Sequence, residues 1–224
     1  MSRARHSIIR PTILATGLAL LYNNWLLAPI LNPHLSTARS LISEISATSQ
    51  PFHQVFQTGD IIAGLISLAM VPFVWRLVRV HDLAWHGVLA ISIAVIGADS
   101  IIDASLPISC APSTDAHCQL LNLHSWVTMA HLTESNIAGV LIFLAPLTWW
   151  WFARRKHRRL AQASLLLAGL ELATGISILV TRAFGIHIEG LLQRGYELAI
   201  GGWIGYLVAL SLRHWLDKSF VIEE

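Results

Sequence analysis

Apolar residues occur along the chain in six long runs, which are separated by short polar or charged stretches. Each run has about 20 mostly apolar residues, the length that an α-helix needs to cross a hydrocarbon layer of about 30 Å. A strand in lipid would leave its backbone amides and carbonyls without partners, so each run is predicted to be helical. The predicted spans are residues 11–32, 55–78, 84–106, 128–152, 160–182 and 190–212. We therefore predict a single all-α domain over residues 1–224, a multi-pass membrane helix bundle with six transmembrane helices.

The composition agrees with this prediction. Hydrophobic residues make up 54% of the chain, charged residues only 12%, and the mean hydropathy is +0.60. A soluble domain does not need so large an apolar fraction to build one core, so the composition indicates a protein whose main partner is the lipid bilayer. The net charge is only +2, and nothing in the chain indicates nucleic-acid binding.

The basic residues are distributed unevenly between the two ends of the predicted spans. Of the 15 Lys and Arg residues, only Arg39, Arg182 and Arg194 fall on one side. The other side collects Arg3, Arg5, Arg10, Arg76, Arg79, Arg154, Arg155, Lys156, Arg158, Arg159, Arg213 and Lys218. Because cytoplasmic loops carry the excess of Lys and Arg, the N and C termini are both predicted to be cytoplasmic, and the opposite ends of the spans to lie outside.

Two cysteines lie in the loop between the third and fourth predicted spans. With this orientation Cys110 and Cys118 are outside the cytoplasm, where thiols oxidise, so the simplest prediction is a disulfide. The alternative is that the two thiolates ligate a metal ion, but they lack the CxxC spacing of such sites.

A polar stripe is predicted at the start of the fourth span. His124, Thr128, His131 and Ser135 follow one another at steps of four, three and four residues, which places them on one face of a helix, and Glu134 borders that face. The stripe indicates either a binding or catalytic pocket or a set of polar residues that line the solvated mouth of the bundle.

Acidic residues are predicted to gather at the same end of the bundle. Asp99 and Asp103 share a helical face at the end of the third span, Asp60 lies near the outer end of the second, and Glu189 and Glu197 lie on the sixth. We expect the polar stripe, including His131, to face Asp60, Asp103 and the head of the sixth helix, forming one pocket open to the outer side. Arg194 is expected to neutralise part of this outer acidic cluster, with Asp60 or Glu197 as its first expected partner.

Glu171 lies near the middle of the fifth predicted span. A bare carboxylate in that position is unfavourable by a few kcal/mol, so we expect Asn23, Asn24 or a bound proton to satisfy it.

Several segments resemble a prokaryotic membrane family known as domain of unknown function 998. The resemblance is carried by Trp25–Pro29, Asn32–Pro33, Ile42–Ala47, Gln50–Pro51, Gly59–Gly64, Asp103–Cys110 and Glu189–Trp203. It implies a bundle of six helices or a similar number in a bacterial plasma membrane, and it brings no established catalytic residue.

Three functions fit these patterns. The first is a non-catalytic membrane protein whose pocket binds a lipid, a small ligand or a partner membrane protein, with His124, Glu134, Ser135, Glu189 and Arg194 as candidate ligand-binding residues. The second is a membrane-embedded hydrolase or transferase for an outer-leaflet lipid, in which His131 acts as general base or joins Asp60 and Asp103 in holding a metal. Its candidate catalytic residues are His131, Asp60, Asp103 and Glu197. The third is a carrier in which Glu171 is the functional carboxyl group; the sequence identifies no cofactor and no oligomeric state.

Overall fold

The computed structural model describes residues 13–78, 83–155 and 157–220, and over these residues the chain is helical, with turns and loops but no strand. The helix Ile13–Tyr22 is followed by η1 (Asn24–Leu27), α2 (Ala28–Leu31), α3 (Ile42–Ile45), α4 (His53–Val78), α5 (Leu83–Ser105), α6 (Ala116–Leu123), α7 (Trp126–Ala153), α8 (Arg158–Ala183) and α9 (Glu189–Phe220). The all-α prediction is therefore confirmed. Outside the described residues lie Arg3, Arg5, Arg10, Arg79 and Lys156, and residues 11 and 12 of the first predicted span.

Four helices, α4, α5, α7 and α8, are long and apolar enough to cross a membrane. Each begins and ends within two residues of a predicted span, and α9 contains the last one. The first span, by contrast, was predicted as one helix and is broken: Ile13–Tyr22 and Asn24–Leu31 meet at an angle of 50°. If this bent pair is one span, the described residues provide up to five.

The break in the first span has a local cause. Pro29 has no backbone N–H, so a continuous α-helix would lose the hydrogen bond from residue 29 to the carbonyl of Trp25. The chain forms the 3-10 turn η1 instead. The bend is held by Asn24, whose Nδ2 donates to Oδ1 of Asp60 at 2.7 Å and to the Phe56 carbonyl at 3.1 Å. These bonds attach the first helix to the start of α4.

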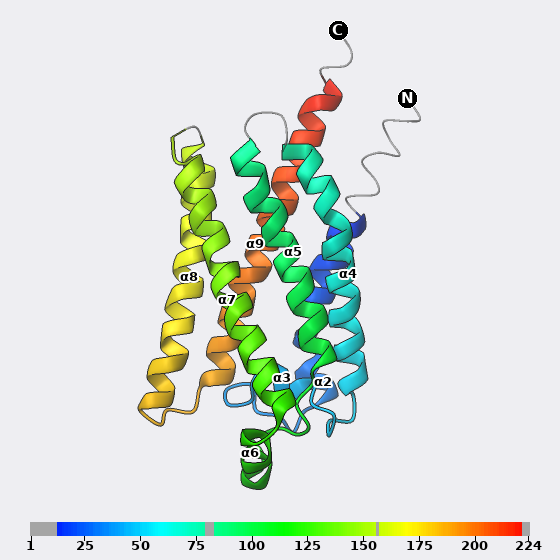
Figure 1. Cartoon of the computed structure of the whole chain (residues 1–224), viewed down its shortest axis with the longest axis vertical. Coiled ribbons are helices and arrows are strands. Elements are labelled where there is room, and N and C mark those ends of the chain that lie inside the picture. The colour runs from blue at the N-terminus through cyan, green and yellow to red at the C-terminus, as the bar shows by residue number, and fades with distance from the viewer. Residues whose placement is uncertain (1–12, 79–82, 156, 221–224) are drawn as a thin grey trace.

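Successive long helices pack side by side, with α4 on α5, α5 on α7, α7 on α8 and α8 on α9 (Figure 1). Helices α4 and α5 approach closely where Gly64 meets Gly97, because a Cβ added to Gly64 would lie 2.6 Å from the Gly97 carbonyl oxygen. In the core, Trp203 of α9 is fully buried and donates from Nε1 to Oγ of Ser92 at 2.7 Å. Within the bundle, the buried hydroxyl group of Ser92 is thus satisfied by Trp203.

One end of the bundle is closed by a cap, which we define as residues 32–52 and 106–125 and which contains α3 and α6 (Figure 1). Backbone hydrogen bonds join its two parts, from Thr48 N to Ile108 O at 3.0 Å and from Ser49 N to Ser109 O at 3.1 Å. The predicted disulfide between Cys110 and Cys118 is present in the cap. The cap therefore fixes the end of α5 and the start of α7 relative to each other.

Candidate functional site

The predicted contact between His131 and Asp103 is present at the cap end of the bundle. Nδ1 of His131, on α7, lies 3.1 Å from Oδ1 of Asp103, on α5, and the His131 side chain is only 7% exposed. Ser135, one turn further along α7, donates to the His131 carbonyl oxygen at 2.8 Å and lies 3.5 Å from Oδ1 of Asp103. His131 and Ser135 therefore face α5 and not the lipid.

The prediction that His124 shares this helical face is wrong. Helix α6 ends at Leu123 and α7 begins at Trp126, and Oγ of Ser125 accepts a hydrogen bond from the backbone N–H of Thr128 at 3.4 Å. Ser125 thus caps a new helix, and His124 lies exposed in the junction. A serine three residues before Thr128 was a signal for this helix start that the periodicity alone did not reveal.

Asp60 lies near Asp103, as expected, but its hydrogen bond comes from Asn24. Both carboxyl groups line a small cavity of about 20 Å³ beneath α3, together with Asn24, Trp25 and other residues. The volume is sufficient for about one water molecule and too small for a lipid or metabolite. Asp60 accepts its hydrogen bond from Asn24 at 2.7 Å. The cavity is therefore a small polar contact region between the cap and the bundle.

Glu197 and Glu171 are also interior carboxyl groups. Oε2 of Glu197 accepts a hydrogen bond from the Tyr22 hydroxyl at 2.8 Å, so Glu197 joins α9 to the first helix. Glu171 is 1% exposed, and within the described part of the chain neither of its carboxyl oxygens has a hydrogen-bond partner. The expectation that Asn23 or Asn24 satisfies Glu171 is wrong, because Asn23 donates to the Ala19 carbonyl and Asn24 to Phe56 and Asp60.

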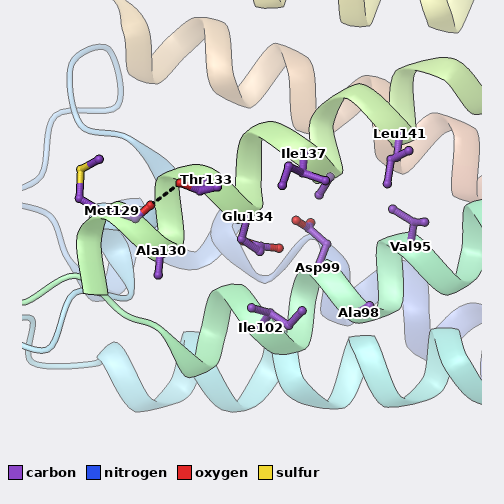
Figure 2. Close-up of a pocket in the computed structure, with 11 residues that line it drawn as sticks. Val95, Ala98, Asp99, Ile102, Met129, Ala130, Thr133, Glu134, Ile137 and Leu141 are labelled. Carbon is purple, nitrogen blue, oxygen red and sulfur yellow. Dashed lines mark hydrogen bonds between the residues drawn. The ribbon is translucent and has the colours of Figure 1, made fainter. Parts of the chain in front are cut away.

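A hollow with a volume of about 620 Å³ lies between α5 and α7 (Figure 2). Most of its lining is apolar: Val95, Ala98, Ile102, Met129, Ala130, Ile137, Ala138 and Leu141, with Thr133 at its edge. Its two acidic residues, Asp99 from α5 and Glu134 from α7, point toward one another across it (Figure 2). We call this hollow the α5–α7 groove. The sequence indicated both acidic residues but not the groove, because the periodicity of a helix shows which residues share a face and not how far apart two helices lie.

The expected partners of Arg194 are wrong. Its Nη1 donates to three backbone carbonyls, those of Thr37 at 2.8 Å, Ser40 at 2.9 Å and Gly190 at 2.9 Å. Its charge is attracted to Glu44 of the cap, and among the described side chains it forms no ion pair with Asp60 or Glu197. The physical reason is that a loop of the cap, residues 37–40, crosses the start of α9 and presents carbonyl oxygens there. The hydrogen bonds of Arg194 therefore attach the cap to the start of α9.

Glu189 lies beside the cap at the start of α9. Its Oε1 is 3.7 Å from Nδ1 of His187, and Glu189 does not line the α5–α7 groove. Of the candidate ligand-binding residues, the structure places Glu134 in the groove and Ser135 beside it, whereas His124, Glu189 and Arg194 lie elsewhere.

Comparison with known proteins adds the family. The model of a family described as "Protein of unknown function (DUF998)" matches residues 13–210, which is most of the chain. The protein belongs to the DUF998 family. No curated protein and no solved structure matches it.

The site of this DUF998 protein therefore has two parts with different chemistry. The inner part consists of the buried His131, which contacts the half-buried Asp103, and the half-buried Asp60, which accepts a hydrogen bond from Asn24. The outer part is the α5–α7 groove, which is open and apolar and carries two carboxyl groups. Among the described residues, no group of three or more His, Cys, Asp or Glu side chains is arranged so that it could hold a metal ion. The groove is the part with room for a ligand.

Proposed function

We propose that this DUF998 protein binds a lipid or a small amphiphile in the α5–α7 groove, with the apolar part along the helices and the polar group at Asp99 and Glu134. The observation that carries the proposal is the groove itself. Its volume of about 620 Å³ is within the range of small-molecule sites, and its lining is apolar apart from one hydroxyl and two carboxyl groups. Binding sites for apolar ligands have this composition, in which a few polar groups fix the orientation of the ligand.

We further propose that the chain crosses the plasma membrane of a bacterium six times, with both termini cytoplasmic. The support is the excess of basic residues at one end of the spans. At that end, the guanidinium of Arg154 lies 3.6 Å from the ring centroid of Trp151 and 5.2 Å from that of Trp150, as expected for an interfacial belt of aromatic and basic residues. In this orientation the cap and the polar end of the groove are extracytoplasmic, and the groove opens toward the outer leaflet.

The experiment is to fill the groove. Ile137 lines it and is 57% exposed, so Ile137→Trp should place an indole in the space that the ligand occupies. Val140, also on α7 and 58% exposed, does not line the groove, so Val140→Trp is the matched control. We expect native mass spectrometry of the protein released from bilayer nanodiscs to show a retained amphiphile in the wild type and in Val140→Trp, but not in Ile137→Trp. Equal retention in all three would contradict the proposal.

A second candidate function is suggested by the His131–Asp103 contact of 3.1 Å. A carboxylate that holds a histidine ring in place is typical of a general base, so the pair could activate water or a hydroxyl group of an outer-leaflet lipid, with Asp60 and Glu197 as further candidates. Ser135 is not poised as the nucleophile, because its hydroxyl donates to the His131 carbonyl. Release of a fatty acid or headgroup from lipid substrates by the purified protein, and its loss in His131→Gln, would support this function. Absence of release by the wild-type protein would contradict this second function, and binding of an amphiphile would then be the one proposed function.

A further inference from the structure

We infer that the ligand of the α5–α7 groove is a single-chain amphiphile whose polar group is a protonated amine. This inference rests on the proposed function of the groove and specifies the chemistry of its ligand. Four features of the groove support it: the position of its two carboxyl groups, an acceptor without a partner, the absence of a basic residue, and the direction in which the apolar lining continues.

The two carboxyl groups come from opposite walls and converge. Asp99 belongs to α5 and Glu134 to α7, and their side chains point toward one another across the groove and lie close enough to interact (Figure 2). Both residues are partly exposed to the groove. An ammonium group placed between them would meet an acceptor on each side, and its N–H groups are donors only.

Glu134 provides a buried acceptor, and the side chain that faces it across the groove is another carboxyl group, that of Asp99. Ser135 lies 3.5 Å from Oε2 of Glu134, whereas Oε1 is buried and has no hydrogen-bond partner. A buried carboxyl oxygen without a partner is costly in an apolar environment. A donor delivered by a ligand would remove that cost, and a charged donor would do so most effectively.

The groove has no basic residue of its own. Its described lining contains no Lys, Arg or His. The nearest basic side chain on α7, His131, is close enough to Glu134 to interact with its charge, but it is buried against Asp103 and does not line the groove. An anionic headgroup would therefore face two carboxyl groups with no basic side chain among the lining residues to bind it, and a phospholipid would bring its phosphate to the same place. These considerations favour a simple amine over both a fatty acid and an aminophospholipid.

The apolar lining determines where the chain of the ligand lies. Asp99 is six residues from the end of α5, so the carboxyl groups lie about 9 Å below that end. The lining continues past them to Val95 and Leu141, and Leu141 is about 10 Å further along α7 than Glu134 (Figure 2). A ligand with its amine between the carboxyl groups would thus extend its chain toward the membrane centre, where its surroundings are apolar on every side.

The test uses the full chain in phosphatidylcholine nanodiscs and a photoreactive diazirine derivative of dodecanol, which has no charge. Labelled peptides are identified by mass spectrometry, and labelling of α5 and α7 is competed with dodecylamine, dodecanol, dodecanoate or dilauroyl phosphatidylethanolamine. We expect dodecylamine to compete at least tenfold more strongly than the other three. The Asp99→Asn/Glu134→Gln variant should still be labelled, but dodecylamine should lose its advantage over dodecanol. Asp115→Asn, which removes an exposed acid and can still cap α6, should behave as the wild type.

The outcomes separate the inference from the function on which it rests. If α5 and α7 are labelled but dodecylamine and dodecanol compete equally, the groove binds amphiphiles and the inference is wrong. If phosphatidylethanolamine competes as well as dodecylamine, the ligand is an aminophospholipid and the assignment to a simple amine is wrong. If α5 and α7 are not labelled, or another protein is cross-linked in the groove instead, the proposed function is wrong as well. Should the double variant fail to fold, the single variants Asp99→Asn and Glu134→Gln provide the same comparison.

Discussion

At the scale of single residues, the site is held together by a buried imidazole and a carboxylate from neighbouring helices. His131 and Asp103 lie 3.1 Å apart, and each would be costly to bury alone. Their pairing links α5 to α7 just above the α5–α7 groove, so the pair positions the walls of the groove whether or not it has chemistry of its own.

This pairing leads to a stability prediction. His131→Ala leaves the Asp103 carboxylate without its partner, and we expect the free energy of unfolding to fall by about 1–3 kcal/mol. His124→Ala, at an exposed histidine outside the helices, should change it by less than about 0.5 kcal/mol. The measurement is steady-state unfolding in mixed micelles with increasing denaturing detergent. Equal stabilities of the two variants would show that the pair does not stabilise the helix contact.

Arg194 gives a second prediction at this scale. Arg194→Gln would leave the carbonyls of Thr37, Ser40 and Gly190 without their shared donor. We expect a loss of about 1–3 kcal/mol and a lower yield of folded protein, because buried acceptors lose their partner. Arg182, which is exposed, is the control, and Arg182→Gln should have little effect. Size-exclusion chromatography and thermal unfolding compare the two, and a larger defect in Arg182→Gln would contradict the account of the cap.

At the scale of helices, hydrophobic run length was sufficient to predict most of the fold. The boundaries of α4, α5, α7 and α8 follow from where polar residues interrupt the apolar sequence, because the membrane thickness sets the length of each run. The break near Asn23 depends on Pro29 and on the hydrogen bond from Asn24 to Asp60, and the break at Ser125 depends on the hydrogen bond that this serine accepts from Thr128. Hydropathy detects neither.

The candidate site was predictable to a similar degree. Helical periodicity placed His131 and Ser135 on one face, and the disulfide loop brought that face to Asp103. The partners of Arg194 in the cap were not predictable, since the carbonyls of Thr37 and Ser40 belong to an irregular loop and any residue type supplies a carbonyl. The α5–α7 groove was not predictable either, because it depends on the distance between two packed helices, and the sequence pattern of each helix does not determine that distance.

The α4–α5 contact can be tested by adding one methyl group. In Gly64→Ala the new Cβ would lie 2.6 Å from the Gly97 carbonyl oxygen, so the helices must move apart. We expect destabilisation by about 1–3 kcal/mol, the usual cost of overpacking. Gly169→Ala, where the new Cβ meets no atom within 4 Å, should be neutral or slightly stabilising. Thermal unfolding in detergent compares the two, and equal melting temperatures would contradict the close approach.

At the scale of the whole molecule, the orientation in the membrane decides which face of the bundle meets which compartment. A reporter fused after Glu224, or inserted between Arg154 and Arg159, should be active only if it functions in the cytoplasm, because the basic residues are concentrated at that end. A reporter inserted in the cap next to Asp115 should show the opposite behaviour. Paired alkaline phosphatase and green fluorescent protein fusions make the measurement. Phosphatase activity at the first two positions would reverse the orientation and place the groove in the inner leaflet.

The central claim is that the α5–α7 groove holds an amphiphile, and the most direct measurement is an experimental structure of the protein in a lipid bilayer. We expect an elongated density between Val95 and Leu141 that ends in a polar group within hydrogen-bond distance of Asp99 and Glu134. A groove filled by side chains of its own walls, or occupied by a helix of a partner protein, would contradict the claim.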